Sequence, residues 1–344
     1  MRTNASSDRV ALTVVDLSKA FQLRDAALRR RFLRAVDGVS FEVGWGETFG
    51  IVGESGSGKS TIGKLLLKLT NPTSGNIILD GIHVESMSER RFRPFRKRVQ
   101  IVFQDPLSAF DPRLTVVDSV LETLRLSTVA PKDRTKAIDD LFTEVGLDPA
   151  LGRRYPRQLS GGQLQRASIA RALAPGPDIV FLDEPTSALD VSIRGQVANV
   201  LRDRQEQRRL AYVLVAHDWT VVEFLADRIA IMYLGEFVEV GSRRQCLGRP
   251  LHPYTRALMT SAGRIESSQA IRLRGELAPV AGEGCRLAGR CPLVQSRCSE
   301  PQKLIEYESG HWARCWRAPE VGLVQAIAVS SGQGIDRVRS PEVM

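Results

Sequence analysis

Eight consecutive residues decide the fold of this chain: Gly53-Glu54-Ser55-Gly56-Ser57-Gly58-Lys59-Ser60. They fit the pattern G-x-x-x-x-G-K-[ST] and stand between a short apolar strand, expected over 48–52, and a helix expected over 61–69. Glycine lets the backbone adopt positive φ angles and approach a phosphate closely. The successive N–H groups then converge on the anion at the helix N-terminus. The run therefore predicts a nucleotide phosphate loop rather than an ordinary Gly/Ser turn.

Two side chains of this loop have distinct predicted tasks. Lys59 should reach the β- and γ-phosphates of the nucleotide, and the Ser60 hydroxyl should bind Mg²⁺. A strand, a Gly-rich loop and a helix in that order indicate an α/β unit with a parallel sheet. The residues predicted to contact the nucleotide here are Gly53, Glu54, Ser55, Gly56, Ser57, Gly58, Lys59, Ser60 and Thr61.

Periodicity places the other elements more coarsely. Residues 10–50 read as short strands around an Arg-rich insert at 24–34, and further strands are expected at 178–183, 211–216 and 228–232. Apolar residues at helical spacing predict helices over 116–126 and 132–145. A helical block thus interrupts the α/β pattern.

A second motif lies about a hundred residues downstream of the first. It is Leu159-Ser160-Gly161-Gly162-Gln163, at the start of an expected helix. Ser160 is a capping residue type, and the two glycines expose backbone N–H groups at a helix start, which makes another anion-binding end. The alternative is an ordinary helix cap, which the position between a phosphate loop and an acidic strand end disfavours.

With both motifs in hand, the sequence resembles the ATP-binding cassette (ABC) ATPases over about residues 10–245. The resemblance implies a P-loop ABC nucleotide-binding domain of the α/β class, with a mixed sheet core and a helical subdomain at about 105–175. It implies ATP and Mg²⁺ as ligands. In this family Ser160, Gly161, Gly162 and Gln163 form the signature that contacts the nucleotide.

The resemblance also implies catalytic residues. The apolar run 179–182 resembles the strand that ends in a Mg²⁺-binding Asp183 and a general base, Glu184, at the sheet edge where ligands bind. Gln104 matches the glutamine that senses Mg²⁺ and the γ-phosphate, and His217 matches the switch histidine. Without the resemblance, these would read as a surface acidic pair, a loop glutamine and a structural histidine.

Two more nucleotide contacts follow from the same resemblance. Asp190 ends the segment 187–190, which resembles the D-loop that crosses the dimer interface. Phe21 stands where the family stacks an aromatic ring on adenine, with Phe32 as a rival and a core role as the alternative.

The signature implies a dimer. In the family, the signature of one cassette closes over the ATP held by the phosphate loop of another, so ATP joins two cassettes and hydrolysis lets them part. Only one cassette is present in this chain, so a partner chain has to supply the other.

Further sequence segments resemble those of the dipeptide and oligopeptide importers. These are residues 35–41, 52–56, 103–106 and 187–192 and the run His252-Pro253-Tyr254-Thr255. This branch implies two membrane permeases, a second and non-identical ATPase subunit, and an extracytoplasmic solute-binding protein. It implies a peripheral position on the cytoplasmic face of the bacterial inner membrane, with residues 107–126 facing the permeases. Di- and oligopeptides are the expected solutes, with nickel, glutathione or sugars as alternatives.

Four of the five cysteines form a pattern. Cys285, Cys291, Cys298 and Cys315 follow C-x5-C-x6-C-x16-C within an expected extension at 246–325. This resembles the branch's C-terminal extension, whose four thiolates can hold a [4Fe–4S] cluster. Zinc is the second choice because no C-x2-C knuckle is present, and unmetallated thiols are the third. Cys246 falls outside the pattern, and residues 326–344 read as a loose tail.

Composition excludes several classes of protein. The 344 residues are 43% hydrophobic and 25% charged, which is typical of a globular chain. No apolar run approaches the roughly 20 residues of a membrane span, and the start lacks a secretory signal, so a cytoplasmic chain is expected. The interval from Gly53 to Leu159, a separation of 106 positions (159 − 53), contains no heptads, which disfavours a DNA-repair type of ABC ATPase. A translation type carries two cassettes, and a catalytically dead cassette would lack Lys59 or Glu184.

The net charge of +9 is concentrated in two segments. Residues 19–34 carry six basic side chains against one acidic (6 − 1 = +5), and so do residues 89–98 (6 − 1 = +5), which leaves −1 elsewhere. Acidic lipid headgroups or permease loops would suit such patches, and ordinary solvated Arg faces are the alternative. Nucleic acid is not expected, because neither patch has interleaved aromatics or a binding module.

Overall fold

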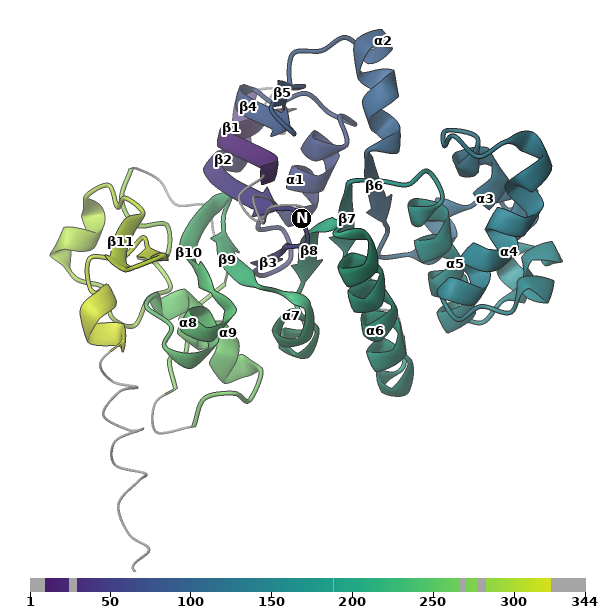
Figure 1. Cartoon of the computed structure of the whole chain (residues 1–344). Helices are drawn as coiled ribbons and strands as arrows, with labels where there is room; N and C mark the ends of the chain where they lie inside the picture. Colours follow the sequence, from purple (N-terminus) through teal and green to yellow (C-terminus); the bar gives the residue numbers. More distant parts are fainter. Residues whose placement is uncertain (1–9, 25–29, 188, 267–269, 277–282, 323–344) are drawn as a thin grey trace, which may run out of the picture. The chain divides into compact units, whose positions relative to one another are not determined.

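The computed structural model describes residues 10–24, 30–187, 189–266, 270–276 and 283–322. The chain divides into two units, residues 1–237 and 238–344 (Figure 1). The sequence-based boundary at 245/246 stays a prediction, and the expected tail at 326–344 lies outside the described residues.

A parallel sheet forms the centre of the first unit. Among the described residues its strand order is β9-β3-β8-β7-β6, with neighbouring strands parallel. The strands are β3 (Thr48–Val52), β6 (Val99–Val102), β7 (Ile179–Asp183), β8 (Ala211–Ala216) and β9 (Arg228–Tyr233). Every residue of β3 and β8 is buried, as expected for strands covered on both faces. The expected α/β fold is confirmed.

The register of these strands brings their carboxyl ends to one edge. Val52 pairs with Ala216, and Asp183 pairs with Val215, while Val102 pairs with Leu182. The phosphate loop, the acidic pair, His217 and Gln104 follow directly on those ends. Four segments that are distant in sequence therefore meet at the edge where open α/β sheets bind ligands.

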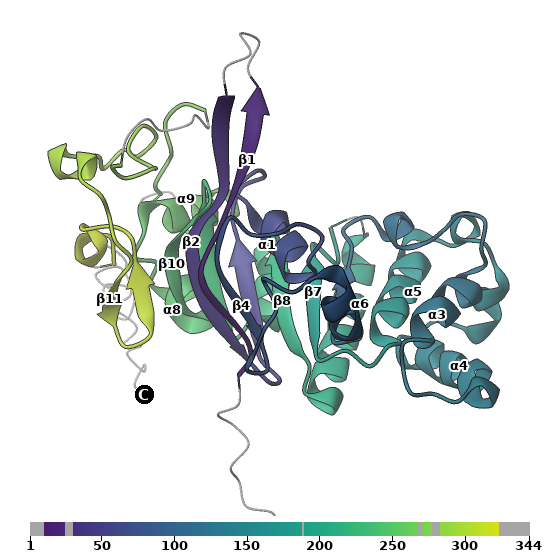
Figure 2. The same cartoon turned by 90° about the horizontal axis from the view of Figure 1, so that it is seen from above.

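An antiparallel sheet of order β2-β1-β4-β5 completes the strands of this unit. It consists of β1 (Val10–Arg24), β2 (Arg30–Gly44), β4 (Ser74–Leu79) and β5 (Ile82–His83). The expectation of short strands around an Arg-rich insert was wrong: the insert lengthens both strands to 15 residues and continues one hairpin (Figure 2). Cross-strand pairing continues outward through Phe21–Leu33 and Gln22–Phe32. Residues 25–29 lie outside the described residues.

The helices of this unit form two groups, one near the parallel sheet and one in a separate helical block. Near the sheet lie α1 (Lys59–Leu66), α6 (Val191–Arg208) and α7 (Trp219–Leu225), and the block contains α3 (Val116–Leu124), α4 (Arg134–Glu144) and α5 (Gly161–Leu173). Thr115 caps α3 through its hydroxyl, and Val116, Val120 and Leu124 on this helix are buried. Helices α3 and α4 lie within the two ranges that periodicity predicted.

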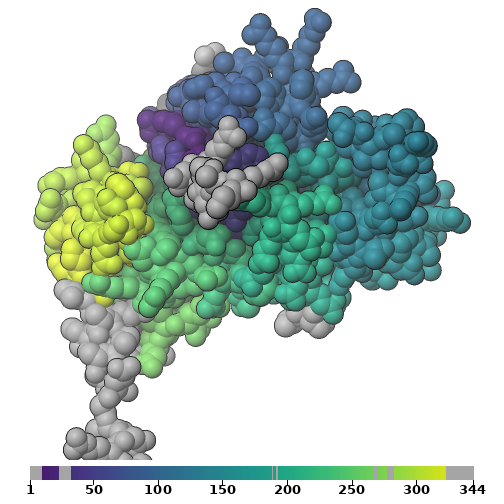
Figure 3. Space-filling view, in the orientation of Figure 1, coloured from purple at the N-terminus to yellow at the C-terminus, as the bar shows by residue number. Residues whose placement is uncertain are grey.

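Short helical turns join these elements. They are α2 (Glu89–Phe92) and the 3₁₀ turns η1 (Arg93–Lys97), η2 (Pro106–Ala109), η3 (Pro131–Asp133), η4 (Pro149–Arg153) and η5 (Pro156–Gln158). The α2–η1 segment carries the second basic patch, and Arg90, Arg91, Arg93 and Lys97 are exposed there. In the space-filling view, long side chains extend from this blue segment into solvent (Figure 3).

The second unit is smaller and antiparallel. It contains β10 (Glu236–Ser242) from Val238 onward, β11 (Ile305–Glu308), β12 (His311–Ala313), α8 (Arg243–Gly248), α9 (Pro253–Ser261) and η7 (Ser296–Ser299). Strand β12 pairs with both β10 and β11. A small core of Leu251, Ala313 and Ala318 lies beside them, with Tyr307 and Cys315 packed against it. No helix of the described residues is long and apolar enough to cross a bilayer.

One close contact tests the packing of α1 on the sheet. A Cβ at Gly63 would lie 2.4 Å from the Phe181 ring, whereas a Cβ at Gly195 in α6 would meet nothing within 4 Å. Gly63→Ala should therefore destabilise the fold by about 1–3 kcal/mol. Gly195→Ala should stabilise it by about 0.5–1 kcal/mol through helix propensity. Thermal unfolding followed by circular dichroism measures both, and a Gly63→Ala midpoint equal to that of the wild type would contradict the packing.

Candidate functional site

Steric constraints shape the phosphate loop. A Cβ at Gly53 would lie 2.2 Å from the Met232 carbonyl oxygen, and one at Gly58, where φ is 112°, would lie 2.0 Å from the Ala35 carbonyl oxygen. The loop therefore passes between β9 and β2 with no room for side chains at either position. Gly58 is the N-cap of α1, so the loop leads directly into a helix N-terminus.

Lys59 lies inside the loop. Its Nζ donates to the carbonyl oxygens of Gly53 and Glu54, at 2.7 Å each, and the residue is only 6% exposed. Burial lowers the pKa of Lys59, and the nearby charges of Glu184, Asp183 and Glu54 partly oppose this effect. The ammonium group thus stands at the centre of the loop, and its hydrogen-bond acceptors among the described residues are two backbone oxygens and the Ser57 hydroxyl, which a phosphate can replace.

Ser60 and Asp183 form a pair of oxygen donors beside the loop. The Ser60 Oγ and an Asp183 carboxylate oxygen are 3.3 Å apart. Burial raises the pKa of Asp183, and the charge of Glu184 adds to the increase. A divalent cation here would relieve that cost, and hydroxyl and carboxylate oxygens are ligands that suit Mg²⁺. The residues present therefore fit the metal that the phosphate loop implies.

Glu184 connects three strand ends. Its Oε2 accepts a hydrogen bond from Gln104 Nε2 at 2.8 Å and lies 3.1 Å from His217 Nδ1. Its φ angle is 45°, in the left-handed region, where non-glycine residues are uncommon and strained. Its N–H donates to Val215 on β8, which holds it in this conformation. The three residues that the sequence predicted as catalytic therefore lie together.

The signature stands at the start of α5. Ser160 and Gln163 form a capping box, in which each side chain accepts a hydrogen bond from the other's backbone N–H. A Cβ at Gly162 would lie 2.9 Å from Ile193 at the start of α6. Within the described part of the chain, the side chains of Ser160 and Gln163 form no hydrogen bond to the phosphate loop. Asp190, the N-cap of α6, is exposed.

The two aromatic candidates for adenine both lie on the long hairpin. Phe21 on β1 is 36% exposed, with the Lys19 ammonium 5.1 Å from the centre of its ring, and Phe32 on β2 is 68% exposed. The hairpin reaches the phosphate loop, because Ala35 on β2 contacts Gly58. Both rings are thus available for stacking, and the choice of Phe21 stays a prediction.

The four patterned cysteines gather in the second unit. Cys285 N–H donates to the Cys298 carbonyl, and Trp316 Nε1 lies 3.5 Å from the Cys298 sulfur. Burial, and then the other thiols, raise the pKa of Cys285 to about 11 and that of Cys315 to about 12. Backbone N–H groups point at the sulfurs of Cys285, Cys291 and Cys315 and oppose this rise.

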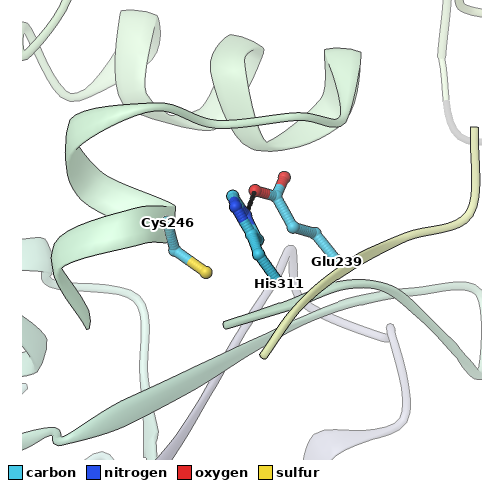
Figure 4. Close-up of side chains that lie close together, drawn as sticks. All are labelled: Glu239, Cys246 and His311. Atoms are coloured by element: carbon cyan, nitrogen blue, oxygen red, sulfur yellow. Dashed lines mark hydrogen bonds and ion pairs between the residues drawn. The ribbon is translucent and has the colours of Figure 1, made fainter. Parts of the chain in front are cut away.

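Cys246 lies in a different buried cluster that sequence reasoning missed. Its sulfur, Glu239 and His311 offer ligand atoms within 4.8 Å of one another, and all three residues are fully buried (Figure 4). Both Glu239 oxygens are already occupied: Oε1 accepts from Leu251 N–H and lies 2.8 Å from His311 Nε2. Oε2 accepts from the N–H of His252 and the hydroxyl of Thr255. The cluster therefore anchors the start of α9, which explains the run His252-Pro253-Tyr254-Thr255 structurally.

Two further residues beside the site were also missed. Arg194 on α6 donates to the Leu189 carbonyl at 2.8 Å and to Asp218 at 3.1 Å. Asp218 follows His217 and caps α7. The only sequence signal was an Asp in a capping position after the switch histidine; Arg194 looks like any other helical arginine.

Comparison with known proteins identifies the family. The model described as "ABC transporter" matches residues 36–187, and that of the "Oligopeptide/dipeptide transporter, C-terminal region" matches residues 238–298. The putative oligopeptide transport ATP-binding protein YkfD of Bacillus subtilis is 40% identical over 314 residues, which are 88% of this chain and 95% of the relative. The oligopeptide transport ATP-binding protein AppF of the same organism is 38% identical over 324 residues, which are 90% and 98% of the two chains.

Solved structures agree with this assignment. The dimeric post-hydrolysis ATP-binding cassette MJ0796, bound to ADP and Pi, superimposes with a TM-score of 0.62 at 29% identity. The match covers 68% of this chain and 99% of that cassette. Together these matches do not favour a DNA-repair or translation ATPase. The chain is an ATP-hydrolysing, ATP- and Mg²⁺-binding subunit of the ABC transporter family and belongs to its oligopeptide/dipeptide transporter branch.

Proposed function

We propose that this chain hydrolyses ATP at the Gln104–Glu184–His217 site and thereby drives the import of di- or oligopeptides. The observation that carries the proposal is the hydrogen-bonded convergence of these three residues beside Lys59, Ser60 and Asp183. The peptide class is supported by the names of relatives about 40% identical over most of the chain. Nickel, glutathione and sugars are not favoured by those names.

The chemistry follows from the positions of the side chains. The loop N–H groups and Lys59 bind the β- and γ-phosphates, and Ser60 and Asp183 would hold Mg²⁺, which would neutralise charge on the phosphate oxygens. Glu184 accepts a proton from water as the oxygen of that water attacks the γ-phosphorus. The bond to the β-phosphate oxygen breaks, and ADP and phosphate leave. Gln104 and His217 orient the carboxylate and lie where the γ-phosphate can compete for their hydrogen bonds.

The signature acts on a second cassette in this proposal. Ser160, Gly161, Gly162 and Gln163, together with Asp190, contact the ATP held by a partner, which is a second and non-identical ATPase subunit. Support comes from the related cassette MJ0796, whose solved structure is dimeric.

Import further requires membrane partners. ABC import cassettes work with membrane permease subunits, and we assign two of these, fed by an extracytoplasmic solute-binding protein, to this chain. The assembly places the chain on the cytoplasmic face of the bacterial inner membrane, without nucleic acid. Residues 107–126 are the proposed permease contact, and the exposed Leu107 and Leu126 at the ends of this range support it.

The cysteine group fits a [4Fe–4S] cluster. Four thiols influence one another electrostatically, and N–H groups point at the sulfurs, as soft thiolate ligands of a cluster require. Zinc is the second choice, because the cysteine spacings lack the C-x2-C knuckles typical of zinc sites.

Replacing the general base tests the reaction. Glu184→Gln keeps the shape and the contacts of the side chain but removes its basicity, so ATP turnover should fall at least about 100-fold while ATP binding persists. Phosphate release and ATP titration measure the two effects. Glu206→Gln, at an exposed position on α6, is the matched control. Residual turnover at the wild-type level in Glu184→Gln would sink the assignment.

Removing the loop ammonium tests nucleotide binding. Lys59→Ala deletes charge-assisted hydrogen bonds worth about 1.5–3 kcal/mol each, so ATP affinity should fall about tenfold or more. Isothermal titration with ATP measures the change, and Lys132→Ala, an exposed lysine of η3, should bind like the wild type. Undiminished ATP affinity in Lys59→Ala would contradict its phosphate role.

Metal analysis tests the cysteine group. Anaerobically purified protein should be brown and contain about four iron atoms per chain. Cys298→Ser should lose colour and iron, whereas Cys246→Ala, outside the group, should keep both. About one zinc per chain would identify a zinc site instead, and a folded, colourless, metal-free protein would refute both metals.

A further inference from the structure

The loop that carries the general base and the loop that carries the switch histidine are joined twice. The first connection is direct, from Glu184 Oε2 to His217 Nδ1. The second runs behind the site, through Arg194, whose Nε donates to Leu189 and whose Nη1 donates to Asp218. Asp218 is bonded covalently to His217, so the two connections close a ring.

The segment between Glu184 and Leu189 is itself held by hydrogen bonds. The Ser187 N–H and hydroxyl both lie within 3.2 Å of the Glu184 carbonyl oxygen, and the Leu189 N–H donates to Thr186. A displacement of Leu189 therefore moves the backbone of Glu184 as well. The carbonyl that Arg194 binds belongs to the residue directly before Asp190.

Arg194 suits this bridging position chemically. A guanidinium presents several donors in a rigid plane and can bind two acceptors at once, which an ammonium does not do with the same geometry. Burial alone would raise the pKa of Asp218, but hydrogen bonds from Thr220 and the charge of Arg194 outweigh it, and the pKa lies below its ordinary value. Asp218 is therefore ionised at neutral pH, and its other oxygen accepts from Thr220 at 2.8 Å.

We propose that Arg194 is a positioning residue for ATP hydrolysis, which links the D-loop carbonyl of Leu189 to Asp218 and so sets the geometry of His217 against Glu184. The inference rests on the proposed ATPase site and adds a residue that touches neither the nucleotide nor the metal. It predicts that a D-loop movement during cassette pairing is transmitted to the switch histidine through the Arg194 bridge.

A groove makes the bridge accessible to a small molecule. It has a volume of about 540 Å³ and lies between α6 and α7, lined among others by Arg194, Asn199, Asp218 and Phe224. Truncation at residue 194 would leave a guanidinium-sized space open to this groove. Added methylguanidine can then occupy the vacated position and bind the same two acceptors.

Arg202 provides a matched control. It lies on the same helix, packs over the Phe224 ring of α7 with its guanidinium 3.7 Å from the ring centre, and donates to the Phe224 carbonyl. It therefore contributes to α6–α7 packing, and within the described part of the chain its side chain forms no hydrogen bond to either loop of the site. If Arg194 served packing alone, Arg202→Ala and Arg194→Ala would have similar effects.

The experiment compares Arg194→Ala, Arg194→Lys and Arg202→Ala in the assembled transporter. Arg194→Ala should lower kcat about tenfold or more with ATP affinity within about twofold of the wild type. Arg194→Lys should retain an intermediate rate, and millimolar methylguanidine should raise the rate of Arg194→Ala but not that of Arg202→Ala. In the isolated full-length chain, the NMR resonances of the His217 imidazole should shift in Arg194→Ala and stay in place in Arg202→Ala.

Two outcomes separate this inference from the proposed function. An active wild type with equal kcat in Arg194→Ala and Arg202→Ala would overturn the Arg194 bridge and leave the ATPase site intact. A wild type whose turnover is unchanged by Glu184→Gln would overturn the site itself. Should Arg194→Ala fail to fold, a wild-type rate and unshifted His217 resonances in Arg194→Lys would also refute the bridge.

Discussion

The parallel register of β3, β6, β7 and β8 is the constraint on which the rest of the structure depends. Because the four strands end at one edge, the residues that follow them are delivered to a single place without any long-range loop. The same edge also carries energetically unfavourable features: a buried ammonium, a half-buried carboxylate whose pKa is raised, and a glutamate whose backbone lies in the left-handed region. Strands β3 and β8, which lead into this edge, are buried along their whole length, and packing of this kind holds unfavourable conformations in place.

Local chemistry explains how much the sequence could predict. The phosphate loop, the capping box of Ser160 and Gln163, and the buried strands are set by neighbouring residues, so pattern reasoning predicts them. The hairpin extension escaped prediction because the pairing of Phe21 with Leu33 depends on cross-strand register rather than on periodicity within one strand. The family resemblance favoured Phe21 over Phe32 as the adenine contact, and this choice stays a prediction because both rings are exposed on the same hairpin.

The residues that were missed share a different property. Arg194 and Asp218 are 24 positions apart, and Glu239 and His311 are 72 apart. Neither pair belongs to a recognisable motif. Taken alone, Arg194 is an ordinary helical arginine, Asp218 is a helix cap, and Glu239 and His311 are strand residues. Their roles arise from tertiary contact, which a single sequence does not reveal. The four cysteines were recognised only because their spacing resembles a known extension, whereas their proximity in space is a property of the fold.

The carboxylate of Glu239, whose two oxygens both take part in hydrogen bonds, also has a consequence for biosynthesis. Leu251, His252 and Thr255 follow it closely in the chain, but the fourth group, His311, is 72 residues away. At a synthesis rate of 5–20 residues per second, the ribosome needs about 4–14 s to deliver that histidine. During this interval the nascent second unit has an incompletely paired acidic group. The strands of the first unit all precede residue 238. The nucleotide-binding unit can therefore fold before the last strand of the smaller unit has been synthesised.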